Sequence, residues 1–182
     1  MLWESGVIEK VRPTLVVYTD PRVREKEAAM SVEGIVPQKE RTAGVDLRGT
    51  RIDYLVTAEH SRHCSLFEFL VAPGFDTGAH YHTKIEETFY VLEGELNFRC
   101  GERVVCAGPG ASAFVPPGMA HSFGNTGTAP ARILLIASPP GHEKYFNELA
   151  EIVSKGGPPD PEAIGKLRAK YDTIQVSALV SE

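Results

Sequence analysis

The stretch that decides the fold of this protein is GFDTGAHYHTKIEETFYVLEGEL, residues 74–96. It holds two histidines one residue apart, His80 and His82, and Glu87 opens a run of alternating apolar side chains. Residues i and i+2 of an extended strand point to the same face, so the two imidazoles project together. A turn over residues 83–86 would bring Glu87 back beside them. The stretch therefore predicts half of a metal site carried by a pair of strands.

A second segment, GPGASAFVPPGMAHSFGN at residues 108–125, carries His121 just after the turn Pro116-Pro117-Gly118. Pairing of strands in a hairpin would place His121 next to His80 and His82. Three imidazoles and one carboxylate suit iron, manganese, nickel, cobalt or zinc. We therefore expect one divalent transition metal, and the ligand types do not choose among these ions.

The middle of the chain consists of short apolar runs separated by Gly, Pro and Asn, a pattern typical of an antiparallel sandwich or barrel. The predicted strands are residues 50–57, 64–71, 87–99, 102–107, 111–116 and 131–138. Apolar residues at helical spacing then predict one helix that ends before Gly156 and a second that begins at Asp160-Pro161. Residues 1–45 form an N-terminal extension with a predicted strand at 14–19 and a predicted helix at 20–30.

Composition narrows the possible partners. The chain has 182 residues and a net charge of −5, with no basic cluster, so we expect neither nucleic acid nor a membrane surface as a partner. It has no long apolar run and no signal-peptide pattern, so we expect a cytoplasmic protein. The three cysteines, Cys64, Cys100 and Cys106, form no CxxC pair, which argues against a disulfide framework or a cysteine-ligated zinc.

The spacing of the histidine segments resembles the two motifs of the cupin superfamily. Gly74-x5-His80-x-His82-x4-Glu87-x6-Gly94 is similar to the first motif, and Gly110-x5-Pro116-x-Gly118-x2-His121-x3-Asn125 to the second. Both match at every position. The helical tail is similar to that of small single-domain bacterial cupins with a quercetin-dioxygenase-like architecture.

This resemblance implies an all-β fold, a jelly-roll or double-stranded β-helix barrel, over residues 46–140. Residues 141–182 would be a helical tail packed on the barrel. The implied metal ligands are His80, His82, Glu87 and His121, and Glu87 would also accept a proton as the catalytic residue. The resemblance further implies a homodimer, to which the strand at 14–19 would contribute either in its own chain or in the partner's sheet.

The site predicts a metal-dependent enzyme, with a dioxygenase-type oxidoreductase as the leading hypothesis. The alternatives are a metal-dependent isomerase, epimerase, lyase or polyketide cyclase, or a cupin that only binds small molecules. We expect a small, largely apolar or aromatic substrate, because phenylalanines crowd the predicted strands. They are Phe67, Phe69, Phe75, Phe89, Phe98, Phe114 and Phe123.

Further polar residues are weaker candidates for the pocket. If their strands turn them inward, an additional acid or base would come from Tyr54, Glu68, Tyr90 or Arg132, although packing or solvent exposure is the simpler interpretation. For His60, His63 and His142 we expect a structural or surface position. Glu86 is expected to be solvated or to support a ligand from outside.

Overall fold

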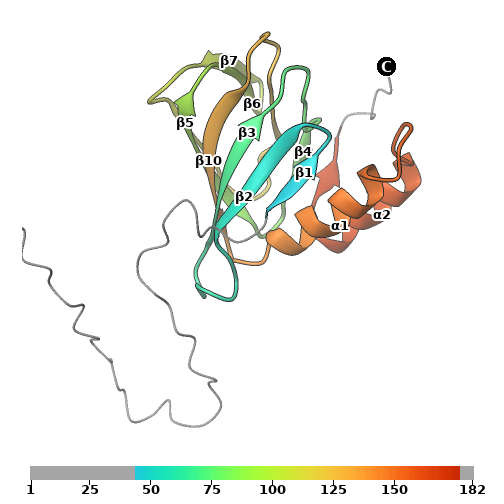
Figure 1. The fold of residues 1–182 in the computed structure, drawn as a ribbon. Helices are drawn as coiled ribbons and strands as arrows, with labels where there is room; N and C mark the ends of the chain where they lie inside the picture. Colours follow the sequence, from blue (N-terminus) through green and yellow to red (C-terminus); the bar gives the residue numbers. More distant parts are fainter. Residues whose placement is uncertain (1–43, 177–182) are drawn as a thin grey trace, which may run out of the picture. The chain divides into compact units, whose positions relative to one another are not determined.

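The computed structural model describes residues 44–176, and the strand and helix predicted at 14–30 lie outside this range. It contains two antiparallel sheets followed by a helical tail (Figure 1). The strands are β1 (Val45–Leu47), β2 (Thr50–Val56), β3 (Ser65–Val71), β4 (His80–Tyr81), β5 (Glu86–Glu93), β6 (Leu96–Cys100), β7 (Arg103–Ala107), β8 (Ser112–Val115), β9 (His121–Gly124), β10 (Ala131–Ser138) and β11 (Ile174–Gln175). The helices are α1 (Glu143–Val153) and α2 (Pro161–Lys170).

The two sheets form the jelly roll that the sequence predicts. One sheet has the strand order β1-β2-β3-β10-β5-β8, and the other has the order β11-β4-β9-β6-β7. Strands that are distant in sequence pair at the centre of each sheet, as β3 and β5 do with β10. This crossing of connections distinguishes a jelly roll from a simple meander.

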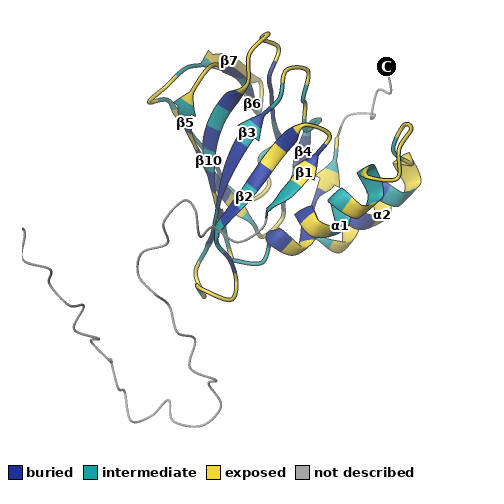
Figure 2. Ribbon diagram, viewed as in Figure 1, coloured by how far each residue is buried: buried dark blue, intermediate teal, exposed yellow. Residues whose placement is uncertain are grey.

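Alternate side chains along β5 face the core, as expected. Glu87, Phe89 and Val91 are buried, whereas Tyr90 between them is 45% exposed. The same alternation on β3 and β10 fills the space between the sheets with large apolar side chains, so buried residues line the inner faces of the strands (Figure 2). Phe114 differs from the other phenylalanines of the strands, because it lies on the outer face of β8 and is 58% exposed.

The predicted strand over residues 87–99 is two strands, because the chain changes sheets at Gly94. Gly94 has a φ of +73°, and a Cβ there would lie 2.9 Å from the Cα of Ala131. Only glycine accepts both the left-handed backbone and the close approach. β5 therefore ends in the six-stranded sheet, and β6 begins in the other. β4 and β9 are the short extended segments expected at His80 and His121, whereas the short strands β1 and β11 were not in the prediction.

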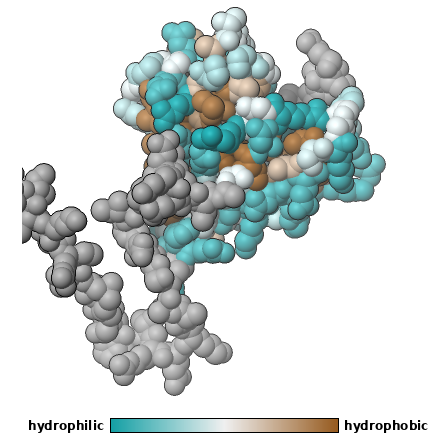
Figure 3. Space-filling view, in the orientation of Figure 1, coloured by the Kyte–Doolittle hydropathy of each residue, from teal (hydrophilic) through white to brown (hydrophobic). Residues whose placement is uncertain are grey.

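Both predicted helices form. Asp160 caps α2 by accepting a hydrogen bond from the backbone N–H of Glu162 at 2.9 Å. Phe146 on α1 packs edge-on against Phe67 and Phe69, with ring centroids 5.1 and 5.6 Å apart. The outward faces of the helices are hydrophilic (Figure 3). The tail therefore adds an apolar wall to the barrel. Within residues 44–176, neither helix has the length and apolar character needed to span a bilayer.

Candidate metal centre

Three short segments bring four ligand-type side chains together. His80 on β4 lies directly opposite His121 on β9 in the strand register. His82 follows β4, and the turn over residues 83–85 returns the chain so that Glu87 enters from β5. One ligand-type atom from each of the four residues lies within 4.8 Å of the others. The turn that the sequence predicts is present, but His121 reaches His80 through the pairing of β9 with β4 and not in a hairpin, because β8 and β9 lie in different sheets.

Each imidazole is held from behind by a backbone carbonyl. The Nδ1 atoms of His80, His82 and His121 lie 2.8, 2.9 and 3.0 Å from the carbonyl oxygens of Gly78, Asp172 and Met119. A carbonyl only accepts, so each Nδ1 carries the proton. When such a ring is neutral, its Nε2 lone pair is available to a metal ion, an arrangement that fixes ligand orientation in metalloproteins.

One inner atom of the cluster lacks the partner that buried polar atoms normally have. The Nε2 of His82 is buried without a hydrogen-bond partner among the described residues, and its distance of 3.6 Å to Glu87 Oε1 is too long for one. The Nε2 of His121 is 2.9 Å from Glu87 Oε2. Leaving such an atom unpaired costs free energy. A metal ion bound by Nε2 atoms and the carboxylate would satisfy it, so the residues present fit a metal.

The electrostatics of the cluster favour the ligand forms of His80 and Glu87. Burial lowers the pKa of His80 to about 3, which keeps its ring neutral. Burial raises the pKa of Glu87, but the neighbouring imidazoles of His121 and His82 outweigh this effect and leave the pKa well below its usual value. For His82, burial lowers the pKa, and the neighbouring Glu87 carboxylate more than reverses that effect. Glu87 is therefore an ionised carboxylate in a buried site.

The cluster opens onto a cavity of about 400 Å³ between the barrel and the tail. Its walls are mainly aromatic and aliphatic, with Phe69, Phe75, Phe89, Phe123, Leu135 and Phe146 among them. Barrel strands supply most of this wall, and α1 closes one side. A small-molecule site is commonly of this kind, apolar with a few polar groups at fixed positions.

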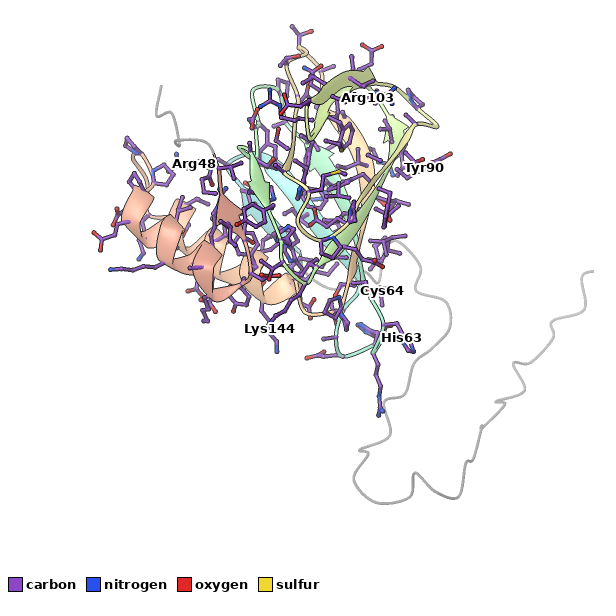
Figure 4. The ribbon with its side chains drawn as sticks, turned by 180° about the vertical axis from the view of Figure 1, so that it is seen from behind. Arg48, His63, Cys64, Tyr90, Arg103 and Lys144 are labelled. Atoms are coloured by element: carbon purple, nitrogen blue, oxygen red, sulfur yellow. The ribbon has the colours of Figure 1, made fainter. Side chains whose placement is uncertain are left out.

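Four polar residues considered for the pocket do not line this cavity. The Tyr54 hydroxyl donates to Asn147 Oδ1 at 2.8 Å, which ties β2 to α1. Glu68 accepts from Arg132 Nη2 at 2.8 Å on the outer face of the six-stranded sheet. Tyr90 projects from the outer face of β5 (Figure 4). The packing or solvent interpretation is therefore correct for all four residues.

The other three histidines lie in two kinds of position, exposed and buried. His60 and His63 are exposed on the loop between β2 and β3, as expected, and Figure 4 shows His63 there. His142 is different: it is buried, lines the cavity, and its ring centroid is 5.7 Å from that of His82. Burial lowers the pKa of His142 to about 4, so its imidazole is neutral at pH 7. Glu86 is exposed, as expected. In the described part of the chain, Cys64, Cys100 and Cys106 are free thiols.

Two residues of the tail lie at the site, although no local sequence pattern predicted them there. β11 pairs with β4, so the end of the described chain lies beside the ligand strand. Asp172, just before β11, accepts hydrogen bonds from the backbone N–H groups of Thr83 and Lys84 at 3.0 and 2.7 Å. Arg168 on α2 lines the cavity. Both lie more than seventy residues beyond Gly94, where the first motif ends, so only the fold brings them to it.

Comparison with known proteins agrees with this geometry. Residues 67–137 match the Cupin domain family. An uncharacterised protein of Methanocaldococcus jannaschii, MJ1618, is 33% identical over 89 residues, which are 49% of this chain and 68% of that protein.

Two solved structures are similar. A predicted oxalate decarboxylase from Thermotoga maritima is 26% identical with a TM-score of 0.51, and the match covers 58% of this chain and 98% of that one. The polyketide cyclase RemF from Streptomyces resistomycificus is 27% identical with a TM-score of 0.50, and the match covers 58% of this chain and 78% of that one. With its jelly-roll barrel and both histidine motifs in place, the chain belongs to the cupin superfamily.

Proposed function

We propose that this protein is a metal-dependent enzyme of the dioxygenase type that acts on a small, largely apolar or aromatic substrate. The observation that carries the proposal is the His80, His82, Glu87 and His121 cluster at the wall of an apolar cavity of about 400 Å³. Four protein ligands leave positions free on an ion that prefers five or six, which distinguishes a catalytic site from a closed structural one.

The chain's own groups have clear tasks in such a reaction. The carbonyls of Gly78, Asp172 and Met119 hold the three rings so that their Nε2 atoms converge. Glu87 is an ionised carboxylate that can accept the proton of an enol or catechol hydroxyl as the substrate enters. Phe69, Phe89 and Phe123 hold an aromatic ring and exclude water. A divalent transition metal in the site would supply a Lewis acid and a template for the ionised substrate and O₂.

Metal content comes first in the test. Elemental mass spectrometry on protein purified without nickel affinity resin should find about one equivalent of a transition metal. His82→Ala should lose it, whereas His63→Ala, which removes an exposed histidine outside the cluster, should retain it. Absence of metal in the wild type, even after reconstitution, would overturn the proposal.

Oxygen uptake then tests the reaction. The metal-loaded chain should consume O₂ with at least one member of a panel of flavonols, β-diketones and catechols, and a chelator should stop the uptake. Substrate binding with neither uptake nor product would refute a dioxygenase and would instead indicate a cupin that only binds small molecules.

A second candidate is proton-transfer chemistry without O₂, as in an isomerase, epimerase, lyase or polyketide cyclase. The 27% identity to the polyketide cyclase RemF favours it. So does His142, a cavity imidazole outside the proposed ligand set that can hold or pass a proton. Turnover under strict anaerobiosis would select this candidate over the dioxygenase.

The homodimer and the cytoplasmic location remain predictions. Light scattering on the full chain and on a chain lacking residues 1–45 would test the first. An unchanged dimer after the deletion would exclude exchange of the strand at 14–19.

A further inference from the structure

A buried arginine in the cavity has more hydrogen-bond donors than partners. Arg168 on α2 lines the same cavity as the metal-site cluster and is only 8% exposed. Its Nη2 donates to the carbonyl oxygen of Thr77 at 2.9 Å. Among residues 44–176, its Nε and Nη1 atoms are buried and have no hydrogen-bond partner. One N–H on Nε and two on Nη1 are therefore unpaired within this part of the chain.

The positive charge of Arg168 is a second unusual feature of this wall. A guanidinium stays protonated under all ordinary conditions, so burial cannot be relieved by loss of a proton. None of the ion pairs among the described residues includes Arg168. Two carboxylates line the cavity: Glu87 already contacts His121 and His82, and Asp76 forms no ion pair with Arg168 among the described residues. Buried cations in proteins are normally paired, because an isolated one is costly.

A neutral hydroxyl lies beside this guanidinium. Tyr145 on α1 lines the cavity and is buried. Burial raises the pKa of its phenol, and the charge of Arg168 opposes that shift only in part, so Tyr145 keeps its proton at pH 7. One wall of this largely apolar cavity thus offers a fixed positive charge and a phenolic donor, both suited to an anion.

We propose that Arg168 binds an anionic group of the substrate, and that the substrate is therefore an aromatic or otherwise apolar carboxylic acid. This inference rests on the proposed function, since it concerns the same cavity. A carboxylate would accept hydrogen bonds from the free edge of the guanidinium, while the hydrocarbon part contacts Phe69, Phe123 and Phe146. Arg168 would act as a specificity-determining residue, and the end of the substrate opposite the carboxylate would face the metal-site cluster.

The test compares an acid with its neutral isostere. Binding of 2-naphthoate and 2-naphthamide to the full-length chain is measured by titration calorimetry at pH 7, with the metal content matched between variants. A charge-assisted hydrogen bond in a buried site predicts that the acid binds about 10- to 100-fold more tightly than the amide. Arg168→Met should abolish this preference while leaving amide binding within about three-fold.

Two further variants make the result specific. Arg168→Lys keeps the charge but not the planar fork, and it should retain an intermediate preference; it decides the question if Arg168→Met does not fold. Arg51→Met removes an arginine whose side chain is 55% exposed, in an ion pair with Asp53, and should leave the preference unchanged. Equal binding of acid and amide by the wild type, or an unchanged preference in Arg168→Met or Arg168→Lys, would overturn the inference.

The readout separates this inference from the proposed function. The preference for the acid is an equilibrium property that is measured without turnover. The binding measurement is repeated after the metal has been chelated. A chain that prefers the acid but consumes no O₂ refutes the dioxygenase and keeps the role of Arg168. A chain that consumes O₂ with neutral substrates and shows no preference for the acid supports the dioxygenase and refutes the proposed role of Arg168.

Discussion

Replacing Asp172 with alanine should lower the affinity of the site for metal, although Asp172 lies outside the proposed ligand set. Asp172 accepts hydrogen bonds from the N–H groups of Thr83 and Lys84, and also from the Thr83 hydroxyl at 2.5 Å. These contacts pin the turn that lies between His82 and Glu87. Burial raises the pKa of Asp172, but the hydrogen bonds from Thr83 and Lys84 outweigh it, so the carboxylate is charged at pH 7.

The size of the effect follows from these contacts. A hydrogen bond to a charged group is worth about 1.5–3 kcal/mol, and about 1 kcal/mol each is reasonable here because solvent reaches the partly exposed side chain. Asp172 also has a φ of +53°, where aspartate is better tolerated than alanine. The free energy of unfolding should therefore fall by about 2–4 kcal/mol. Metal affinity should fall about 10- to 100-fold, as for other residues that orient metal ligands.

The assay is competition for metal against a fluorescent chelator, together with thermal unfolding of the chelated protein. Asp160→Ala is the matched control, because it removes the cap of α2 and should cost about 1 kcal/mol with no change in metal affinity. If Asp172→Ala lowers stability but binds metal as tightly as Asp160→Ala does, the tail adds stability only. Our account of how it holds the ligand turn would then be wrong.

Two further predictions concern the fold and its pH dependence. Gly94→Ala should lower the free energy of unfolding by about 3 kcal/mol, from left-handed backbone strain plus the overlap with Ala131. Gly110→Ala, at a φ of +86° with open space around it, should cost only about 1 kcal/mol, and equal losses in denaturant titrations would contradict the steric argument. The pKa values of buried His80 and His142 are lowered to about 3 and 4, whereas both rings take up a proton near 6.5 when unfolded. The chelated protein should therefore lose stability as the pH falls from 6.5 towards 4, by up to about 1.4 kcal/mol per pH unit for each ring. The raised pKa of His82 acts in the opposite direction, so the readout is the difference from His142→Phe, whose slope should be shallower; identical slopes would show that His142 is not neutral in the folded state.

The features of this protein that depend on local geometry could be predicted from the amino-acid sequence alone. The spacing of His80 and His82 on one face of an extended segment, and the alternation after Glu87, follow from the two-residue period of a strand. The motif glycines and prolines mark turns, because their backbone preferences are properties of single residues. These local rules predicted the strands of a sandwich or barrel, and the resemblance of the two motifs to those of cupins implied the four ligands, which the fold brings within 4.8 Å of one another.

Which other side chains line the cavity could not be predicted from the sequence and became clear from the tertiary structure. The inward or outward direction of Tyr54 and Glu68 depends on strand register and on what packs against each face, and register is set by partners distant in the chain. Asp172 lies 90 residues from His82, whose Nδ1 contacts its carbonyl oxygen, and Arg168 lies 91 residues from Thr77. No periodicity or motif spans such a distance. Contacts of this kind exist only once the tail has packed on the barrel, and they give the cavity its positive charge and hold the ligand turn.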